Sequence, residues 1–283
     1  MKQLSIAIPA SVVSDTPHLR EKTSKIGFIG RAAAIYRVNK VVIYPDDLRT
    51  NQKKEIDLIT KLLTYMETPQ YLRKRLFELS PDLQFAGILP PLRTAHHPLN
   101  RNGRNLKVGE YREGVALSKI RQGTLVDIGV EQPALARNAD MNVGKRVTVK
   151  IVKPGSPAEV EPADHDEISS YWGYTVSVEK HSFGQMVKSG DFDLTVATSK
   201  YGSPFAGLKE RLAEKWKAAD RVAVIFGAPT AGLNEIAASE GLKLEQVADF
   251  VVNTIPCQGT ETVRTEEAVF ASLAVLSVYV NKN

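Results

Sequence analysis

The 283-residue sequence has a single cysteine, Cys257, and no apolar run that approaches the ~20 residues needed to span a membrane. One cysteine excludes an internal disulfide framework and a zinc site built from several cysteines, so we expect a reducing, cytoplasmic setting. The apolar stretch near the start is interrupted by Pro9 and is too short for an export signal. We therefore predict a first strand there and no membrane partner.

Four common catalytic motifs are also missing: the phosphate loop Gly-x-x-x-x-Gly-Lys-Ser/Thr, the dinucleotide motif Gly-x-Gly-x-x-Gly, the hydrolase motif Gly-x-Ser-x-Gly and the zinc motif His-Glu-x-x-His. Their absence disfavours an ATPase, a conventional Rossmann dehydrogenase, an α/β-hydrolase and a zinc peptidase. His96 and His97 are adjacent, and adjacent side chains point apart in a strand. Because no third ligand is evident, we interpret them as loop histidines and predict no metal site.

The overall composition is that of a globular protein, with 43% hydrophobic and 24% charged residues. Lys and Arg number 37 against 32 Asp and Glu, which gives a net charge of +5. This mild excess favours a polyanionic partner without requiring one, so charge alone leaves nucleic-acid binding an open question.

Two parts of the chain alternate apolar strands with helices, which predicts an α/β fold with a parallel sheet covered on both faces. In the first part we predict strands at 5–13 and 40–44 and helices at 15–38 and 55–66. In the last part we predict strands at 192–198, 221–226 and 249–255, and helices at 205–218, 233–239 and 262–280.

Between these parts the helical pattern gives way to short β-type runs separated by glycine, at 114–120, 124–130 and 146–152. Residues 85–164 hold twelve Lys and Arg against eight Asp and Glu, a surplus of four positive charges. The size and pattern favour a five-stranded barrel of the oligonucleotide-binding type. A solvated insertion with no specific role is the open alternative. We thus predict an α/β domain of residues 1–84 and 168–283, interrupted by a barrel domain at 85–167.

Three loops rich in small and hydroxyl residues follow the last three predicted strands, at 198–199, 226–232 and 255–260. Open α/β sheets bind ligands at the carboxyl ends of their strands. Glycine and proline allow the backbone to approach a flat ligand such as adenine. The loops therefore predict one shared binding cleft, although each loop taken alone also fits a simple turn.

Three segments resemble the ordered motifs of the SPOUT class of knotted methyltransferases. The last and most specific motif is Thr254-Ile255-Pro256, then Gly259, then Thr-Val-Arg-Thr-Glu-Glu-Ala at 262–268. The middle motif resembles 226–233, and the first resembles 26–34 followed by 41–43. The resemblance covers residues 1–84 and 168–283.

This resemblance implies a trefoil knot, in which the final helix passes through the loop before it, and a homodimer. It also implies S-adenosylmethionine as cofactor, with its adenine against the backbone of Gly227, Ile255 and Gly259. The chain is similar to the archaeal and eukaryotic branch with an inserted oligonucleotide-binding barrel. The cofactor-lining residues that we expect are Thr198, Gly227, Ala228, Pro229, Gly232, Ile255, Pro256, Gly259, Thr260, Val263 and Thr265.

The resemblance predicts an RNA methyltransferase that acts on rRNA or tRNA. Arg31 lies where the ribose 2′-O enzymes of the class have their catalytic arginine, whereas Arg264-Thr265-Glu266 followed by 273–276 resembles the uridine-N3 branch. We favour uridine N3, with Arg31 and Arg264 as catalytic residues that fix a phosphate or stabilise a developing oxyanion. A non-catalytic RNA-binding factor and a small-molecule α/β enzyme are the remaining hypotheses.

Overall fold

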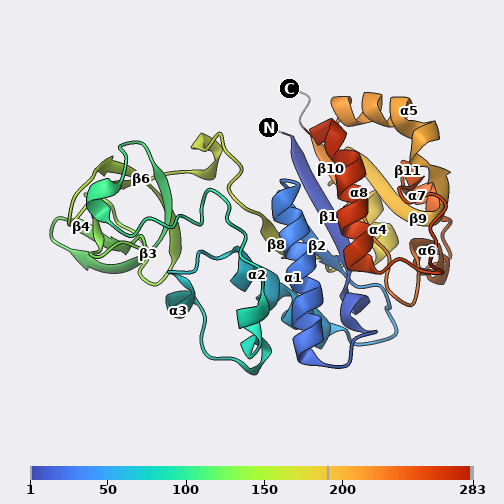
Figure 1. Ribbon diagram of the computed structural model, residues 1–283, viewed down its shortest axis with the longest axis horizontal. Coiled ribbons are helices and arrows are strands. Elements are labelled where there is room, and N and C mark those ends of the chain that lie inside the picture. The colour runs from blue at the N-terminus through green and yellow to red at the C-terminus, as the bar shows by residue number, and fades with distance from the viewer. Residues whose placement is uncertain (1, 190, 281–283) are drawn as a thin grey trace. The chain divides into compact units, whose positions relative to one another are not determined.

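The structure is a computed structural model that describes residues 2–189 and 191–280, and it contains two compact units (Figure 1). The first unit comprises the described residues of 1–64, 82–90 and 174–283. The second comprises residues 65–81 and 91–173. The chain therefore leaves the first unit and returns to it, and each unit is described separately below.

The first unit is built on a six-stranded sheet in the order β11-β9-β10-β1-β2-β8, and every pair of neighbouring strands is parallel. This confirms the parallel sheet predicted from the apolar runs. Its strands are β1 (Gln3–Pro9), β2 (Lys40–Tyr44), β8 (Thr175–Val178), β9 (Leu194–Pro204), β10 (Arg221–Ile225) and β11 (Phe250–Asn253).

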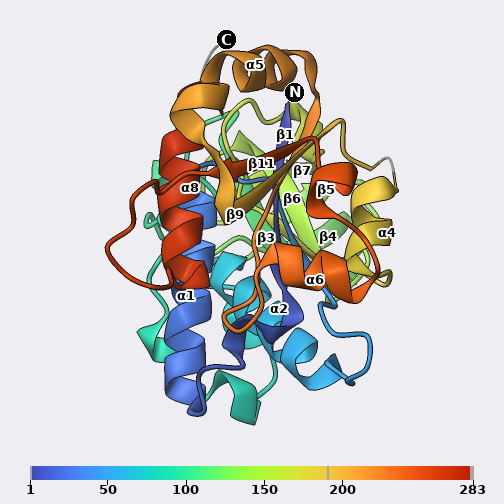
Figure 2. The same ribbon diagram turned by 90° about the vertical axis from the view of Figure 1, so that its right-hand side faces the viewer.

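Helices cover both faces of this sheet. Helices α1 (Leu19–Ile35) and α8 (Thr265–Val280) lie side by side on one face, and α4 (Phe183–Lys188) and α6 (Leu233–Ser239) lie on the other (Figures 1 and 2). The ring of Phe270 packs edge-on against Phe28, with their centroids 6.4 Å apart. The remaining helices are α2 (Lys53–Glu67), α3 (Arg73–Leu76), α5 (Phe205–Ala218) and α7 (Leu244–Val247), together with the 3-10 turns η1 (Ala10–Val13), η2 (Pro81–Leu83), η3 (Ala86–Ile88), η4 (Gly103–Asn105) and η5 (His165–Glu167).

The first strand and the first helix are both shorter than predicted. The strand expected at 5–13 ends at Pro9, and Ala10–Val13 forms a buried 3-10 turn instead. The helix expected at 15–38 begins at Leu19 and ends at Ile35. Arg37 adopts a positive φ of 57°, a left-handed conformation that ends a helix.

Gly27, on the buried face of α1, permits close packing. A Cβ there would lie 3.0 Å from side-chain atoms of Leu89 and of Pro90. Contacts at this distance are tighter than packed carbons accept, so a larger residue would push α1 away from these two side chains.

The second unit contains a closed five-stranded barrel in the order β3-β4-β5-β7-β6, which the pairing of β3 with β6 completes. Its strands are β3 (Tyr111–Ile120), β4 (Gly123–Asp127), β5 (Ala134–Arg137), β6 (Arg146–Lys153) and β7 (Glu159–Pro162). Buried side chains such as Val126, Ile128 and Val149 fill it. The five-stranded barrel is confirmed, although the four-residue strands β5 and β7 were not predicted individually.

A search of the described residues finds no helix that is both long and apolar enough to cross a membrane.

Candidate functional site

Two loops and the middle of β9 lie side by side at the carboxyl edge of the sheet. The loop predicted at 198–199 was wrong, because β9 continues through these residues to Pro204. Strands β11, β9 and β10 are neighbours, so the segments that follow their sheet-paired residues start next to one another. These segments hold Thr198, the turn at 226–232 and the loop at 254–264. All the predicted cofactor residues lie in them except Thr265, which begins α8.

The turn at 226–232 is held tightly to the sheet. Phe226 donates its N–H to the carbonyl of Ala7 at 2.9 Å, and the buried Tyr44 hydroxyl donates to the carbonyl of Phe226 at 2.6 Å. A Cβ on Gly227 would lie 3.0 Å from the backbone nitrogen of Leu233, so the turn closes on itself where only glycine fits well. Burial, reinforced by two nearby carboxylates, raises the pKa of Tyr44 well above its ordinary value, so the phenol stays a donor.

Two threonines join this turn to β9 and to α8. The hydroxyl of Thr198 donates to the carbonyl of Ile225 at 2.9 Å, and the hydroxyl of Thr265 donates to the carbonyl of Gly227 at 3.1 Å. Three predicted residues from distant parts of the sequence therefore lie around one turn. Thr198 and Thr265 therefore hold this turn in place, and each hydroxyl does so by donating to a backbone carbonyl.

The loop at 254–264 is anchored at its start and open at its tip. Ile255 donates its N–H to the Asn253 side chain at 2.9 Å. Pro256, Gly259 and Thr260 are exposed, and a Cβ on Gly259 would meet nothing within 4 Å. Among the hydrogen bonds of the described residues, none is donated by the amides of Gly259 or Thr260. These free donors and the open space beside Gly259 fit a flat, polar ligand.

The two predicted catalytic arginines lie on different elements. Arg31 is half-buried on α1, and Arg264 is exposed in the turn before α8. An exposed arginine at this place could also form a surface ion pair with Glu261 or Glu267. Within residues 2–189 and 191–280 its guanidinium forms no ion pair, and Glu267 instead accepts the backbone N–H of Arg264 at 3.0 Å.

A buried charge cluster beside the start of α8 was not found from the sequence. The ammonium of Lys25, whose side chain is only 5% exposed, lies 2.6 and 2.9 Å from the two oxygens of Asp15 and 3.5 Å from Glu266. Burial would raise the pKa of Asp15, but the hydrogen bond and charge of Lys25 outweigh it and lower that pKa. The sequence signal that could have indicated this cluster is a lysine next to Ile26 on the buried face of α1.

Two cavities lie elsewhere along the carboxyl edge of the sheet and share Asp47, Arg49 and Ser239. One, of about 530 Å³, is also lined by Thr230 and Ala231 of the turn at 226–232. The other, of about 670 Å³, is lined by α4 and the segment that follows α6. Sequence reasoning missed both cavities because residues from three distant segments build each one.

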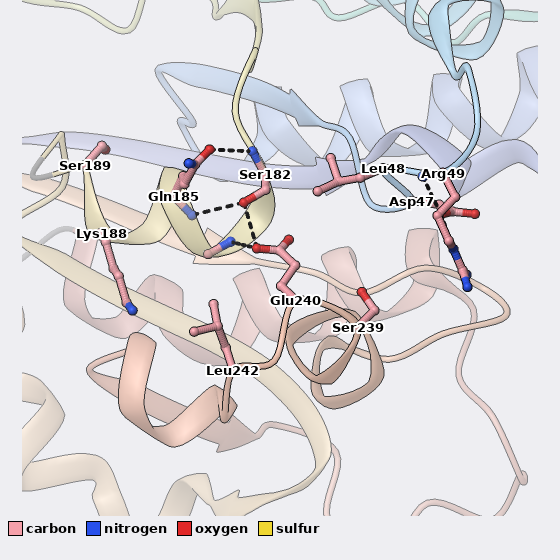
Figure 3. Close-up of a pocket in the computed structure, with 11 residues that line it drawn as sticks. Asp47, Leu48, Arg49, Ser182, Gln185, Lys188, Ser189, Ser239, Glu240 and Leu242 are labelled. Atoms are coloured by element: carbon pink, nitrogen blue, oxygen red, sulfur yellow. Dashed lines mark hydrogen bonds and ion pairs between the residues drawn. The ribbon is translucent and has the colours of Figure 1, made fainter.

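Figure 3 shows the hydrogen-bonded group inside the larger cavity. A carboxylate oxygen of Glu240 accepts from the Ser182 hydroxyl at 2.7 Å and from the Gly184 amide at 3.0 Å. The Ser182 hydroxyl also accepts the amide of Gln185 at 3.4 Å. Glu240 therefore accepts hydrogen bonds from the start of α4, and these bonds already stabilise its negative charge.

The second unit contains a buried ion network. Arg146 forms a bidentate pair with Glu67, at 2.5 and 3.0 Å, and reaches Glu113 at 2.6 Å. Glu113 also accepts from the Thr148 hydroxyl and the Trp172 indole. Burial would raise the pKa of Glu67, but hydrogen bonds from His96 and Arg146, with their charges, lower it to about 2. Glu67 is therefore ionised at neutral pH.

His96 and His97 belong to this network and lie in a turn, which confirms their interpretation as loop histidines. A ring nitrogen of each lies near the carbonyl oxygen of Glu67, at 3.0 Å for His96 and 2.6 Å for His97, and the ring centroids are 4.3 Å apart. Burial, together with the adjacent His96, lowers the pKa of His97 to about 4. Both histidines therefore hold the turn at 95–97 against the last residue of α2, Glu67. Among the described residues, no group of three or more His, Cys, Asp or Glu side chains is arranged to hold a metal ion.

The twelve basic residues of the barrel segment divide into paired and unpaired groups. Six of them form ion pairs with carboxylates: Arg112, Lys119, Arg137, Arg146, Lys150 and Lys153. The other six are exposed and have no such pair among the described residues: Arg93, Arg101, Arg104, Lys107, Arg121 and Lys145. Three of these, Arg101, Arg104 and Lys107, are close together in the loop before β3. That loop contacts the β6–β7 loop, since Gly155 donates its N–H to the carbonyl of Gly103 at 3.0 Å.

Known proteins resemble this chain over nearly its whole length. A family model described as "Putative RNA methyltransferase" matches residues 3–276. An uncharacterized protein of Halobacterium salinarum is 33% identical, with 97% of this chain and 98% of that protein covered. The 28S rRNA (uridine-N(3))-methyltransferases of Mus musculus and Homo sapiens are 31% and 30% identical over 96% of this chain, and the match covers 75% and 77% of those proteins.

Proposed function

Because the chain belongs to this RNA methyltransferase family and is an RNA methyltransferase, we propose that it methylates N3 of a uridine in ribosomal RNA with S-adenosylmethionine as methyl donor. The relatives from mouse and human carry that activity in their names and align with nearly the whole chain. The single observation that carries the proposal is the joining of the turn at 226–232 to β9 and α8 through Thr198 and Thr265.

We place the adenosyl group of the donor against the turn at 226–232 and the loop at 254–264. Gly259 leaves room beside the backbone, and the amides of Gly259 and Thr260 are available to the edge of a base. The other predicted lining residues, Ala228, Pro229, Gly232, Pro256 and Val263, lie in the same two segments. The predicted lining residues offer only backbone groups and hydroxyls as hydrogen-bond partners, which suits a neutral heterocycle such as adenine.

The donor supplies a methyl group already activated by its sulfonium. The remaining task is to align the acceptor and to assist loss of the N3 proton to solvent. We assign Arg264 to the negative charge that spreads over the uracil oxygens as N3 loses its proton, because its guanidinium has no ion-pair partner among the described residues. We assign Arg31 to the RNA phosphate or to the same charge.

Ribose 2′-O methylation is the second candidate, favoured by Arg31, which stands where the 2′-O enzymes have their arginine. The two targets differ in the atom that receives the methyl group. Arg31 should therefore be indispensable for a ribose target, whereas Arg264 should dominate for uracil N3.

We propose that the barrel binds RNA and is of the oligonucleotide-binding type. Its strand order, with β5 parallel to β7 and β3 closing on β6, supports this assignment. Loops between strands carry much of the binding in such barrels. The cations of the loop before β3, which contacts the β6–β7 loop, are therefore the best phosphate ligands: Arg101, Arg104 and Lys107.

Three further features belong to the proposal. Exposed apolar side chains on α1 and α8, with Phe28 53% and Val278 54% exposed, support a homodimer through these helices. From the family resemblance we also propose a trefoil knot, in which α8 passes through the loop before it. A cytoplasmic location and the division at residues 85 and 168 remain predictions.

Calorimetry with purified protein tests the cofactor site. We expect one molecule of S-adenosylmethionine or S-adenosylhomocysteine to bind per chain. Gly259→Val should abolish binding without loss of stability, since its side chain enters open space. Gly207→Ala, on α5 with nothing within 4 Å of the added carbon, is the matched control and should bind normally. Absence of binding by the unmodified protein would end the proposal.

A further inference from the structure

Strand β9 contains an arch beside the candidate cofactor site. Residues Ala197 and Ser203 pair with the consecutive residues Val251 and Val252 of β11, so the intervening residues 198–202 have no counterpart in that strand. Such extra residues bend a strand out of the sheet and re-aim its side chains. We call residues 198–202 the β9 arch. It starts at Thr198, whose hydroxyl is bound to β10.

The arch is held in one position. A Cβ on Gly202 would lie 2.8 Å from backbone atoms of Val251 and Val252, so the returning leg rests directly on β11. The Tyr201 N–H donates to the hydroxyl of Ser199 at 3.2 Å, within the arch. These contacts fix the backbone on both sides of its crest.

Asn253 and Lys200 tie the arch to the loop at 254–264. The amide of the Asn253 side chain donates to the carbonyl of Lys200 at 2.9 Å, while its oxygen accepts the N–H of Ile255. The Lys200 ammonium donates to the carbonyl of Glu261 at 3.3 Å. The crest of the arch is thus clamped to the loop that we assign to the adenosyl group.

Tyr201 stands at the crest with 69% of its surface exposed. The Lys200 ammonium lies 5.1 Å from the centroid of its ring. A large, rigid ring held in solvent beside a cation suits a nucleobase, which stacks on aromatic faces while its phosphate is attracted to the positive charge. An aromatic ring that serves only packing would be covered by its own chain.

We propose that Tyr201 is a stacking platform for an unpaired base of the RNA substrate, beside the base that is methylated. The inference rests on the proposed cofactor site for its position near the methyl donor. Since any base offers a flat face, the platform should hold single-stranded RNA with little sequence preference. The established family membership supplies RNA as the partner but assigns no role to this residue.

Fluorescence anisotropy with a labelled single-stranded oligouridine tests the platform on the full-length protein. Tyr201→Ala should weaken RNA binding roughly fivefold or more, since stacking of one base contributes at least that much. Tyr201→Phe should bind like the unmodified protein because the ring face is kept. Leu48→Ala removes a side chain that is 63% exposed elsewhere in the same unit and should leave RNA binding unchanged.

Two further measurements separate this inference from the proposed function. Calorimetry should give the same affinity for S-adenosylmethionine in Tyr201→Ala and in the unmodified protein. Equal RNA affinity of Tyr201→Ala and Tyr201→Phe would overturn the platform and leave the methyltransferase intact. A change from dimer to monomer in Tyr201→Ala, measured by light scattering, would overturn it too, because the ring would then be a subunit contact. Failure of the unmodified protein to bind the donor would instead count against the cofactor site.

Discussion

The buried ion network of the second unit makes a quantitative prediction for Arg146→Met. Arg146 is the only Lys or Arg within 4 Å of the carboxylates of Glu67 and Glu113 among the described residues. The side chains of these two glutamates are only 9% and 1% exposed. Methionine keeps most of the volume but leaves two buried carboxylates without the guanidinium. Breaking a buried pair in this way costs roughly 3–5 kcal/mol of stability.

The pKa of Glu67 gives a second magnitude, for the combined effect of His96 and Arg146 on this carboxylate. Its fall from 4.5 to about 2 on folding corresponds to about 3 kcal/mol of stability at neutral pH. Because the folded pKa is the lower one, this stabilisation is complete above about pH 4.5 and is lost as the pH falls towards 2. The difference in stability between Arg146→Met and the unmodified protein should therefore shrink over that range.

The two tryptophans allow each unit to be followed separately. Trp172 donates to Glu113 in the second unit, whereas Trp216 lies buried on α5 in the first. Guanidinium unfolding in a Trp216→Phe background then reports on the network alone. The matched control is Arg137→Met, which breaks an exposed pair with Glu159 at 2.7 Å and should cost less than about 1 kcal/mol. The reasoning is refuted if Arg146→Met costs no more than this control.

Three other predictions concern the RNA, the turn and the dimer. The slope of log affinity against log salt for single-stranded RNA should fall by about 2 when three cations are replaced by alanine: Arg101, Arg104 and Lys107. An unchanged slope in such a salt titration would mean that the RNA phosphates do not contact these three residues. Thr265→Val removes the hydrogen bond to Gly227 and should cost about 1 kcal/mol in thermal unfolding and weaken donor binding in calorimetry; unaltered binding would mean that α8 does not position the turn. Phe28→Asp should turn a dimer into a monomer in light scattering, and a persistent dimer would exclude α1 as the interface.

Local sequence patterns predicted the elements whose formation depends on local signals. The predicted helices at 205–218 and 233–239 match α5 and α6, and the predicted strand at 40–44 matches β2. Each has an apolar pattern bounded by clear breaks. Strands β5 and β7 are only four residues long and were missed, because they gain their structure from pairing across the barrel rather than from their own sequence.

Residues of the candidate site were predictable where they follow strands. Glycine and proline mark the loops at 226–232 and 255–260 directly, and strand order then brings these loops to one edge. The charge clusters were hidden because their members are distant in sequence: Glu67 and Arg146 are 79 positions apart. The β9 arch was hidden too, since only the register with β11 reveals that residues 198–202 are extra.

Nucleoside mass spectrometry tests the central claim most directly. Purified protein is incubated with unmodified ribosomal RNA and a donor that carries an isotopically labelled methyl group, and the RNA is then digested to nucleosides. The account predicts label in 3-methyluridine, retained on the base after the glycosidic bond is cleaved. Label that remains on the ribose, or RNA without label from a protein that binds the donor, would contradict it.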